Sequence, residues 1–192
     1  MPIYNDYRML LFFPEYRYLI LEGFKEIIKM NNIKFDIIAG TSTAGIPHGA
    51  LLADRLNVPF IYIRDKPKAH GLKNQIEGID AESDLKQKSV VVIEDLISTG
   101  GSSARAVQAV RDANGIVDYC ISIFNYGLDK AASAFNKLDI PCRTISILTY
   151  DVLLKAAKKN GYMSESQIEL LEDWKNNPFG WGEKHGFSKV GK

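Results

Sequence analysis

The stretch that most constrains this 192-residue chain is 89–103, which reads SVVVIEDLISTGGSS. The β-branched run from Val90 to Ile93 predicts a buried strand that ends in two adjacent carboxylates, Glu94 and Asp95. Ser, Thr and Gly residues follow and predict a turn into a helix that begins near Ser102. The chain is therefore expected to fold around a strand, a turn and a helix N-terminus.

This arrangement predicts an anion site. Backbone N–H groups at a helix N-terminus lack partners within the helix, and the helix dipole favours a negative charge. We expect these donors to be Thr99, Gly100, Gly101 and Ser102. Carboxylates at the entrance would repel a bare phosphate, but they suit sugar hydroxyls or a metal ion. The ligand that fits has a ribose, a phosphate and magnesium.

A second loop of small polar residues follows the apolar run FDIIAG at 35–40. It reads TSTAGIP over 41–47 and leads into a helix expected at 48–57. Such turns are usually plain connectors. At the carboxyl end of a parallel strand beside a phosphate site, however, the loop suits a second phosphate group. We predict that it binds pyrophosphate through Thr41, Ser42, Thr43, Ala44 and Gly45.

A third segment concentrates positive charge after a strand expected at 59–64. Its cationic side chains are Arg64, Lys66, Lys68, His70 and Lys73. A solvated surface loop and a mobile lid over a charged leaving group both fit this composition. Because two predicted phosphate sites lie nearby, we favour the second alternative and predict a mobile lid over residues 65–78.

Composition narrows the class of protein. A hydrophobic content of 46% suits a single domain over 1–192. The net charge of +1 gives no field for nucleic acid or a membrane surface, and the N-terminus has neither a signal-peptide layout nor a spanning run. Cys120 and Cys142 lie in apolar segments and are interpreted as buried free thiols in a reducing cytoplasm.

Strands alternate with helices along the rest of the chain. Residues 1–13 are expected to be extended, and a tail over 176–192 is either docked or disordered. Buried strands are predicted at 35–39, 59–63, 90–94, 116–124 and 143–148, and further helices at 14–30, 102–113, 128–138, 151–161 and 164–174, the last with a capping box from Ser164 and Gln167. This order predicts an α/β fold whose mainly parallel sheet is covered on both faces.

Three motifs carry a resemblance to a known family. IEDLISTGGSS resembles the phosphoribosyl-pyrophosphate (PRPP) motif of the type I phosphoribosyltransferases. YIRDKPKAHGLKNQIEG at 62–78 resembles the hood-side loop of the orotate phosphoribosyltransferases, and PIYNDYR at 2–8 resembles another motif of that family. The resemblance implies the type I phosphoribosyltransferase fold, a mainly parallel twisted sheet flanked by helices. It also implies a reduced N-terminal hood, because the family usually carries a further segment before the first motif.

The resemblance further implies an activity: transfer of ribose 5-phosphate from PRPP to orotate, giving orotidine 5′-monophosphate and pyrophosphate in UMP biosynthesis. It implies Mg²⁺ without a direct protein ligand, and a homodimer whose lids reach into the partner's site. The catalytic residues would be Lys68, His70 and Asp95, with Ser98 near orotate. The other PRPP contacts would be Arg64, Lys66, Lys73, Glu94, Leu96, Ile97, Ser98, Thr99, Gly100, Gly101 and Ser102.

Other functions remain open at this point. A phosphoribosyltransferase for another nucleobase would keep the phosphate sites and change only the hood. A non-catalytic PRPP-binding regulatory protein would keep the fold, and so would a truncated, inactive relative. His48 and His185 are interpreted as structural or surface residues.

Overall fold

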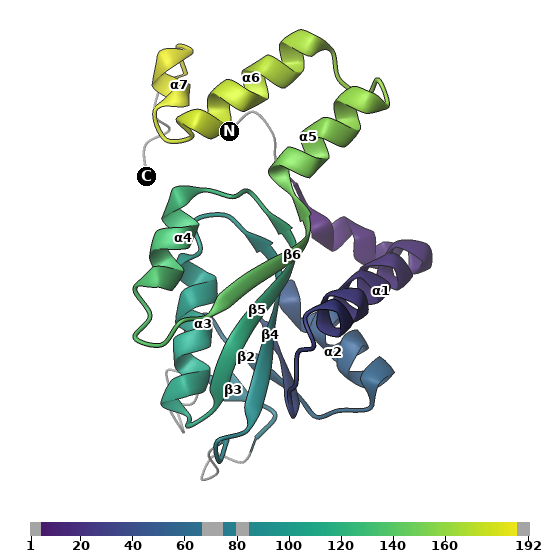
Figure 1. Ribbon diagram of the computed structural model, residues 1–192, viewed down its shortest axis with the longest axis vertical. Coiled ribbons are helices and arrows are strands. Elements are labelled where there is room, and N and C mark those ends of the chain that lie inside the picture. Colours follow the sequence, from purple (N-terminus) through teal and green to yellow (C-terminus); the bar gives the residue numbers. More distant parts are fainter. Residues whose placement is uncertain (1–4, 67–74, 80–84, 188–192) are drawn as a thin grey trace. The chain divides into compact units, whose positions relative to one another are not determined.

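The computed structural model describes residues 5–66, 75–79 and 85–187 (Figure 1). The chain divides into two compact units. The larger unit spans Tyr7–Thr149, and the smaller contains residues 5, 6 and 150–187. The single domain over 1–192 stays a prediction.

A single sheet organises the larger unit, and in the described residues it has six strands in the order β3-β2-β1-β4-β5-β6. All neighbouring strands pair in parallel except β2 and β3, which are antiparallel. The strands are β1 (Ile37–Thr41), β2 (Phe60–Ile63), β3 (Ile76–Glu77), β4 (Ser89–Ile97), β5 (Ile116–Asn125) and β6 (Arg143–Thr149). The predicted mainly parallel sheet is confirmed.

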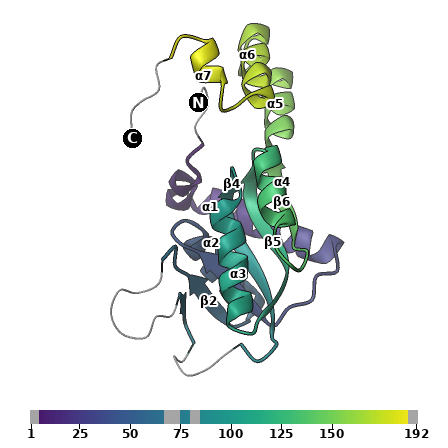
Figure 2. The same ribbon diagram turned by 90° about the vertical axis from the view of Figure 1, so that its left-hand side faces the viewer.

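Helices cover both faces of this sheet (Figures 1 and 2). The helices are η1 (Tyr7–Phe12), α1 (Pro14–Met30), α2 (Gly45–Leu56), α3 (Gly101–Asp112) and α4 (Asp129–Asn136). In α1 and α2, Phe24 and Leu52 join a cluster with Val91 of β4. In α3, Val107 joins the opposite cluster with Val92. Successive side chains of a strand point to opposite faces, so β4 serves both cores.

Four elements differ from the sequence-based expectation. Residues 7–12 form a 3₁₀ helix instead of an extended segment, with Tyr7 packed against the Phe124 ring at 5.4 Å. β4 continues to Ile97, so the two carboxylates lie within the strand. β3 lies inside the predicted lid segment, where no strand was expected. β6 is an edge strand with an exposed or half-exposed surface, because it pairs only with β5, and its prediction as a buried strand was wrong.

The smaller unit contains three helices among its described residues, α5 (Tyr150–Lys159), α6 (Glu165–Asn176) and α7 (Trp181–Lys184). The predicted capping box is confirmed: the Ser164 hydroxyl accepts from the Gln167 N–H, and the Gln167 side chain accepts from the Ser164 N–H. Trp181 is buried and stacks on His185 at 4.3 Å. The tail is therefore structured as far as residue 187. No helix within the described ranges is long and apolar enough to cross a membrane.

Candidate active site

The two predicted phosphate loops lie side by side at the carboxyl edge of the sheet. β1 and β4 are neighbours, and the strand order runs outward in opposite directions from this pair. In open parallel sheets such a switch point is the usual place for a ligand. α2 begins at Gly45 directly after the first loop, and α3 begins at Gly101 after the second. Neither N-terminus has a side-chain cap, which leaves backbone donors available for an anion.

Glycines allow both loops to pack closely. A Cβ at Gly45 would collide with the carbonyl oxygen of Ile93, so this turn lies directly against β4. Gly100 has a φ of 74° and a Cβ there would lie 2.9 Å from the Cα of Ala131. This left-handed conformation favours glycine. The Ser42 N–H donates to the Ile63 carbonyl over 2.8 Å, which fixes the first loop to β2.

The buried Glu94 side chain connects the end of β1 to the first turn of α3 by hydrogen bonds. Glu94 is 6% exposed. Oε1 accepts hydrogen bonds from the Thr41 hydroxyl (2.7 Å) and the Asp95 N–H (3.1 Å), and Oε2 accepts from the Ser103 hydroxyl (3.0 Å). One carboxyl group therefore holds the loop after β1 and the first turn of α3 in a fixed relation.

Burial changes the protonation of this group. Desolvation first, and the adjacent Asp95 carboxyl second, raise the pKa of Glu94 to about 8, although the hydrogen bonds from Thr41 and Ser103 favour the charged form. Glu94 is therefore mainly neutral at pH 7. A neutral carboxyl suits a structural link near a polyanion, because it adds no repulsive charge.

Asp95 is half-buried, and it acts electrostatically on half-buried Tyr7 and on buried His48. Burial raises the pKa of Tyr7, and the Tyr126 and Asp95 charges raise it further. Burial lowers the pKa of His48, against the opposing effect of Asp95. His48 is 1% exposed, so it is a buried residue, and its Nε2 has no hydrogen-bond partner within the described part of the chain.

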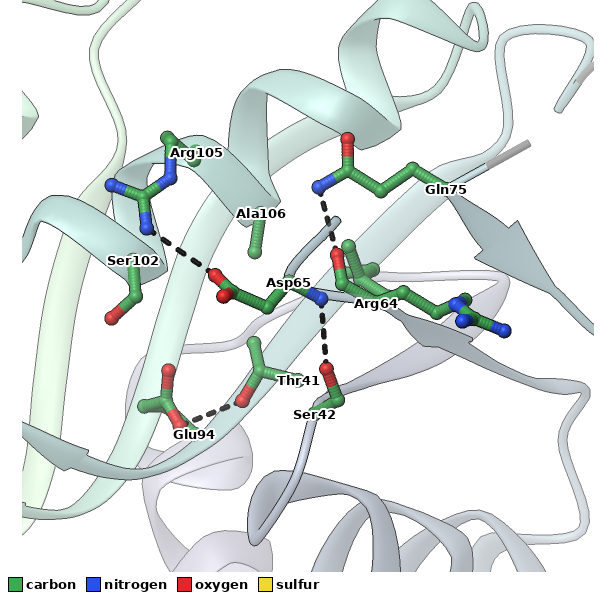
Figure 3. A pocket seen from close by; sticks show the side chains of 10 residues that line it. Thr41, Ser42, Arg64, Asp65, Gln75, Glu94, Ser102, Arg105 and Ala106 are labelled. Carbon is green, nitrogen blue, oxygen red and sulfur yellow. Dashed lines mark hydrogen bonds and ion pairs between the residues drawn. The ribbon is translucent and has the colours of Figure 1, made fainter. Parts of the chain in front are cut away.

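A small pocket, partly open to solvent, lies beside these loops (Figure 3). Its walls come from the end of β1 and the first loop, the end of β2 and the residues after it, Gln75 before β3, Glu94 of β4, and the first turns of α3. The lining residues are Thr41, Ser42, Ile63, Arg64, Asp65, Gln75, Glu94, Ser102, Arg105 and Ala106. Across it, Nη2 of Arg105 lies 3.3 Å from Oδ1 of Asp65. Hydroxyls and guanidinium groups around one hollow can bind an anion.

Comparison with known proteins identifies the family. The phosphoribosyl transferase domain model matches residues 17–158. An orotate phosphoribosyltransferase from Staphylococcus haemolyticus is 46% identical over 176 residues, which are 92% of this chain and 84% of that protein. The chain belongs to the orotate phosphoribosyltransferase family.

Solved structures agree with this membership. An orotate phosphoribosyltransferase from Aeropyrum pernix superposes with a TM-score of 0.68 at 26% identity, over 84% of this chain and 85% of that chain. A UMP synthase from Leishmania donovani gives a TM-score of 0.75 at 26% identity, over 92% of this chain and 36% of that chain. The type I phosphoribosyltransferase fold is thereby confirmed.

Many of the residues predicted for PRPP in this family member lie at the described site. Thr41, Ser42, Arg64, Glu94 and Ser102 line the pocket. On the second loop, Ser98 is half-exposed and Thr99 exposed, whereas the Ile97 side chain points into the core. The remaining predicted residues of the loops, Thr43, Ala44, Gly45, Asp95, Leu96, Gly100 and Gly101, flank the same edge.

Arg64 lines the pocket, but its guanidinium pairs with Glu77 at 3.3 Å. Lys66 is exposed and is not among the pocket residues. Lys68, His70 and Lys73 lie outside the described residues, so their roles stay predictions.

Five pocket residues were not identified from the sequence: the apolar Ile63 and Ala106, and the polar Asp65, Gln75 and Arg105. The helical spacing of three between Ser102 and Arg105 could have revealed the arginine, because residues i and i+3 share a helix face.

Proposed function

We propose that this protein transfers ribose 5-phosphate from PRPP to orotate, giving orotidine 5′-monophosphate and pyrophosphate in UMP biosynthesis. The observation that carries the proposal is the 46% identity, over most of both chains, to a protein named orotate phosphoribosyltransferase. The paired loops at the switch point support it, because PRPP carries a phosphate on carbon 5 of the ribose and a pyrophosphate on carbon 1. A cytoplasmic location is part of the proposal, and the two free buried cysteines are consistent with a reducing compartment.

In this reaction the bond from ribose carbon 1 to a pyrophosphate oxygen breaks, and a bond from carbon 1 to a ring nitrogen of orotate forms. That nitrogen loses its proton, which the released pyrophosphate or water accepts. Pyrophosphate leaves with the bonding electrons, so the transition state has positive charge on the ribose and negative charge on the leaving group. The protein must hold orotate, the ribose and the pyrophosphate in line, and it must stabilise the negative charge on the departing pyrophosphate. The reaction needs no covalent intermediate with the protein.

The second loop suits the 5-phosphate. N–H groups of the uncapped α3 N-terminus and the hydroxyls of Ser98, Thr99 and Ser102 would hold it. Asp95 would orient the ribose hydroxyls, because it is half-buried at the edge of the site. Glu94 was predicted to do the same, and its bonds to Thr41 and Ser103 support an indirect role, in which it positions the loops.

The first loop suits the pyrophosphate. The α2 N-terminus lacks a side-chain cap, and Thr41 and Ser42 line the pocket. We assign the remaining neutralisation to Arg64, Lys66, Lys68, His70 and Lys73, as the family resemblance implies. Of these, Lys68, His70 and Lys73 lie outside the described residues.

Magnesium belongs to the proposal as a cofactor that arrives with the substrate. In the described ranges no three His, Cys, Asp or Glu side chains lie together as a metal site. Mg²⁺ usually keeps several waters and binds through one or two carboxylates plus substrate phosphates. Asp95 fits contact with such an ion through its water shell, whereas Glu94 is committed to hydrogen bonds. When bound, the ion neutralises pyrophosphate charge.

We also propose a homodimer with shared active sites. In the larger unit, η1 and α1 expose large apolar side chains: Met9, Phe12, Leu19 and Met30 are 67%, 81%, 62% and 76% exposed. Apolar surface of this kind favours association with another protein surface. Mixing inactive Lys68→Ala and Asp95→Asn proteins tests the sharing. Recovered activity supports it, because one site of each mixed dimer would be intact, and a mixture that stays inactive contradicts it.

The test of the proposed reaction is the loss of orotate absorbance with PRPP and Mg²⁺, with uracil, hypoxanthine and adenine as alternative acceptors. Turnover with orotate alone supports the proposal. Turnover with another base instead would favour the alternative of a different nucleobase specificity. PRPP binding without turnover would favour a regulatory or inactive relative.

A further inference from the structure

The carboxylate of Asp65 lies inside the anion pocket (Figure 3). Its backbone N–H donates to the Ser42 hydroxyl over 2.9 Å, which attaches the residue to the first loop. The preceding Arg64 is fixed to Gln75 by two bonds: the Arg64 N–H donates to the Gln75 carbonyl (2.9 Å), and Gln75 Nε2 donates to the Arg64 carbonyl (2.8 Å). The main chain is thus held at Asp65 and at the residue before it, and the Asp65 side chain projects across the pocket.

Arg105 meets this carboxylate from α3. Its Nη2 lies 3.3 Å from Oδ1 of Asp65, and it stands one helical turn after Ser102, another pocket residue. The other arginine of the pocket wall, Arg64, is paired with Glu77. Arg105 therefore presents its guanidinium to the pocket, with an acid of the same chain as its partner.

The pocket holds two acids, and the buried Glu94 is hydrogen-bonded within the protein, so Asp65 is the exposed acid among groups that otherwise suit an anion. A carboxylate resembles part of a phosphate, since it offers negatively charged oxygens to the same donors. We propose that Asp65 takes the place of the pyrophosphate group in the free protein, and that Arg105 binds pyrophosphate oxygens after exchanging Asp65 for them. The inference rests on the proposed function, because it assigns a further residue to the pyrophosphate end of PRPP.

Exposure makes this exchange feasible. The side chains of Arg105 and Asp65 are 64% and 59% exposed, and ion pairs this open to water are weak. Pyrophosphate carries several charges and can accept two parallel hydrogen bonds from a guanidinium group. When pyrophosphate displaces the Asp65 carboxylate from Arg105, the carboxylate can turn into solvent, because its side chain already lies at the surface. It then lies beside a polyanion, so its repulsion weakens pyrophosphate binding and promotes release of this product.

The test is calorimetric binding of pyrophosphate at constant Mg²⁺ to the full chain and to Asp65→Asn, Arg105→Gln and the double variant. Arg105→Gln should weaken binding about tenfold, the size expected for a lost charge-assisted hydrogen bond. Asp65→Asn should tighten it about threefold through the removal of one weak, exposed repulsion. The double variant should bind more tightly than Arg105→Gln, but by less than about threefold, because part of the Asp65 effect acts through Arg105 and part through direct repulsion of the anion.

A charge-matched control is Lys88→Gln. Lys88 forms a comparable exposed pair with Asp36 at 3.6 Å, next to the first residue of β4, whereas the pocket lies at the other end of that strand. Its removal should leave pyrophosphate binding unchanged, since salt screens charges beyond about 10 Å. Arg105→Lys should bind with intermediate affinity, because it keeps the charge and loses the planar fork.

Three results would overturn the inference: no pyrophosphate binding by the unaltered protein, unchanged binding in Arg105→Gln, or weaker binding in Asp65→Asn. The last would show that the carboxylate assists the anion instead of competing with it. The assay contains no nucleobase, so a failure of orotate turnover leaves its result intact. Normal orotate turnover together with any of the three results would overturn this inference alone.

Discussion

The hydroxyl of Thr41 donates a hydrogen bond to Oε1 of Glu94 over 2.7 Å. The two residues lie on neighbouring parallel strands, and Ser103 of α3 binds the other carboxyl oxygen at 3.0 Å. The relative position of the two anion loops therefore depends on one buried side chain. Because that side chain is mainly neutral at pH 7, the link also depends on pH.

Glu94→Gln should remove part of the pH dependence of folding. The pKa of Glu94 is raised from 4.5 to about 8, so the folded state binds the proton more tightly than the unfolded state. Its contribution to stability is complete below pH 4.5 and is lost as pH rises towards 8, at up to about 1.4 kcal/mol per pH unit. Urea unfolding at pH 5, 6, 7 and 8 measures this. The difference in free energy of unfolding between wild type and variant should shift in favour of the variant as the pH rises. A difference that stays constant with pH would contradict the prediction.

Ser103→Ala should destabilise the fold and impair the site together. The change leaves Oε2 of Glu94 without its donor in a buried place, at a cost of about 1–2 kcal/mol. Turnover should also fall, because the first turn of α3 loses its link to the other loop. Denaturant unfolding measures the loss of stability, and steady-state kinetics on the same samples measure the loss of turnover. As a control, Ser166→Ala, at an exposed position of α6, should stay within about 0.5 kcal/mol of wild type.

Gly100→Ala and Gly101→Ala form a matched pair. A methyl group at Gly100 meets a left-handed backbone and the main chain of Ala131 at 2.9 Å, so we expect a loss of about 1–3 kcal/mol. At Gly101 it would meet only the end of the Arg105 side chain at 3.6 Å, and the change should be within about 1 kcal/mol of neutral. Thermal unfolding distinguishes the two variants. Equal losses would contradict the proposed geometry of the turn.

Asp95→Asn and Lys68→Ala should each lower turnover by more than about tenfold without unfolding the protein, because both residues are proposed to act on the reacting complex and not on the core. Asp95 is half-buried at the site, and Lys68 lies outside the described residues. Steady-state rates with orotate and PRPP, beside circular dichroism spectra, test this. Wild-type rates in both variants would refute the assignment of these roles.

The alternation of strands and helices, and two loops of small polar residues suited to an anion, could be predicted from the sequence. Helix α1 from Pro14 to Met30, the strand at Val90–Ile93 and the capping box at Ser164 all follow from local pattern. The PRPP-like motif was recognisable because its residues are contiguous. Local information of this kind does not require knowledge of which segments meet.

Which residues face one another depends on tertiary packing. β6 was predicted as a buried strand with apolar Ile145, Ile147 and Leu148, yet at the sheet edge its residues are exposed or half-exposed. Glu94 reads as a ligand for ribose, yet Thr41 and Ser103 bind it within the protein. Asp65 and Arg105 are 40 positions apart, and no periodicity connects them. Burial, edge position and ion pairing depend on contacts between distant segments, and these contacts are set by the packing of the sheet and its helices.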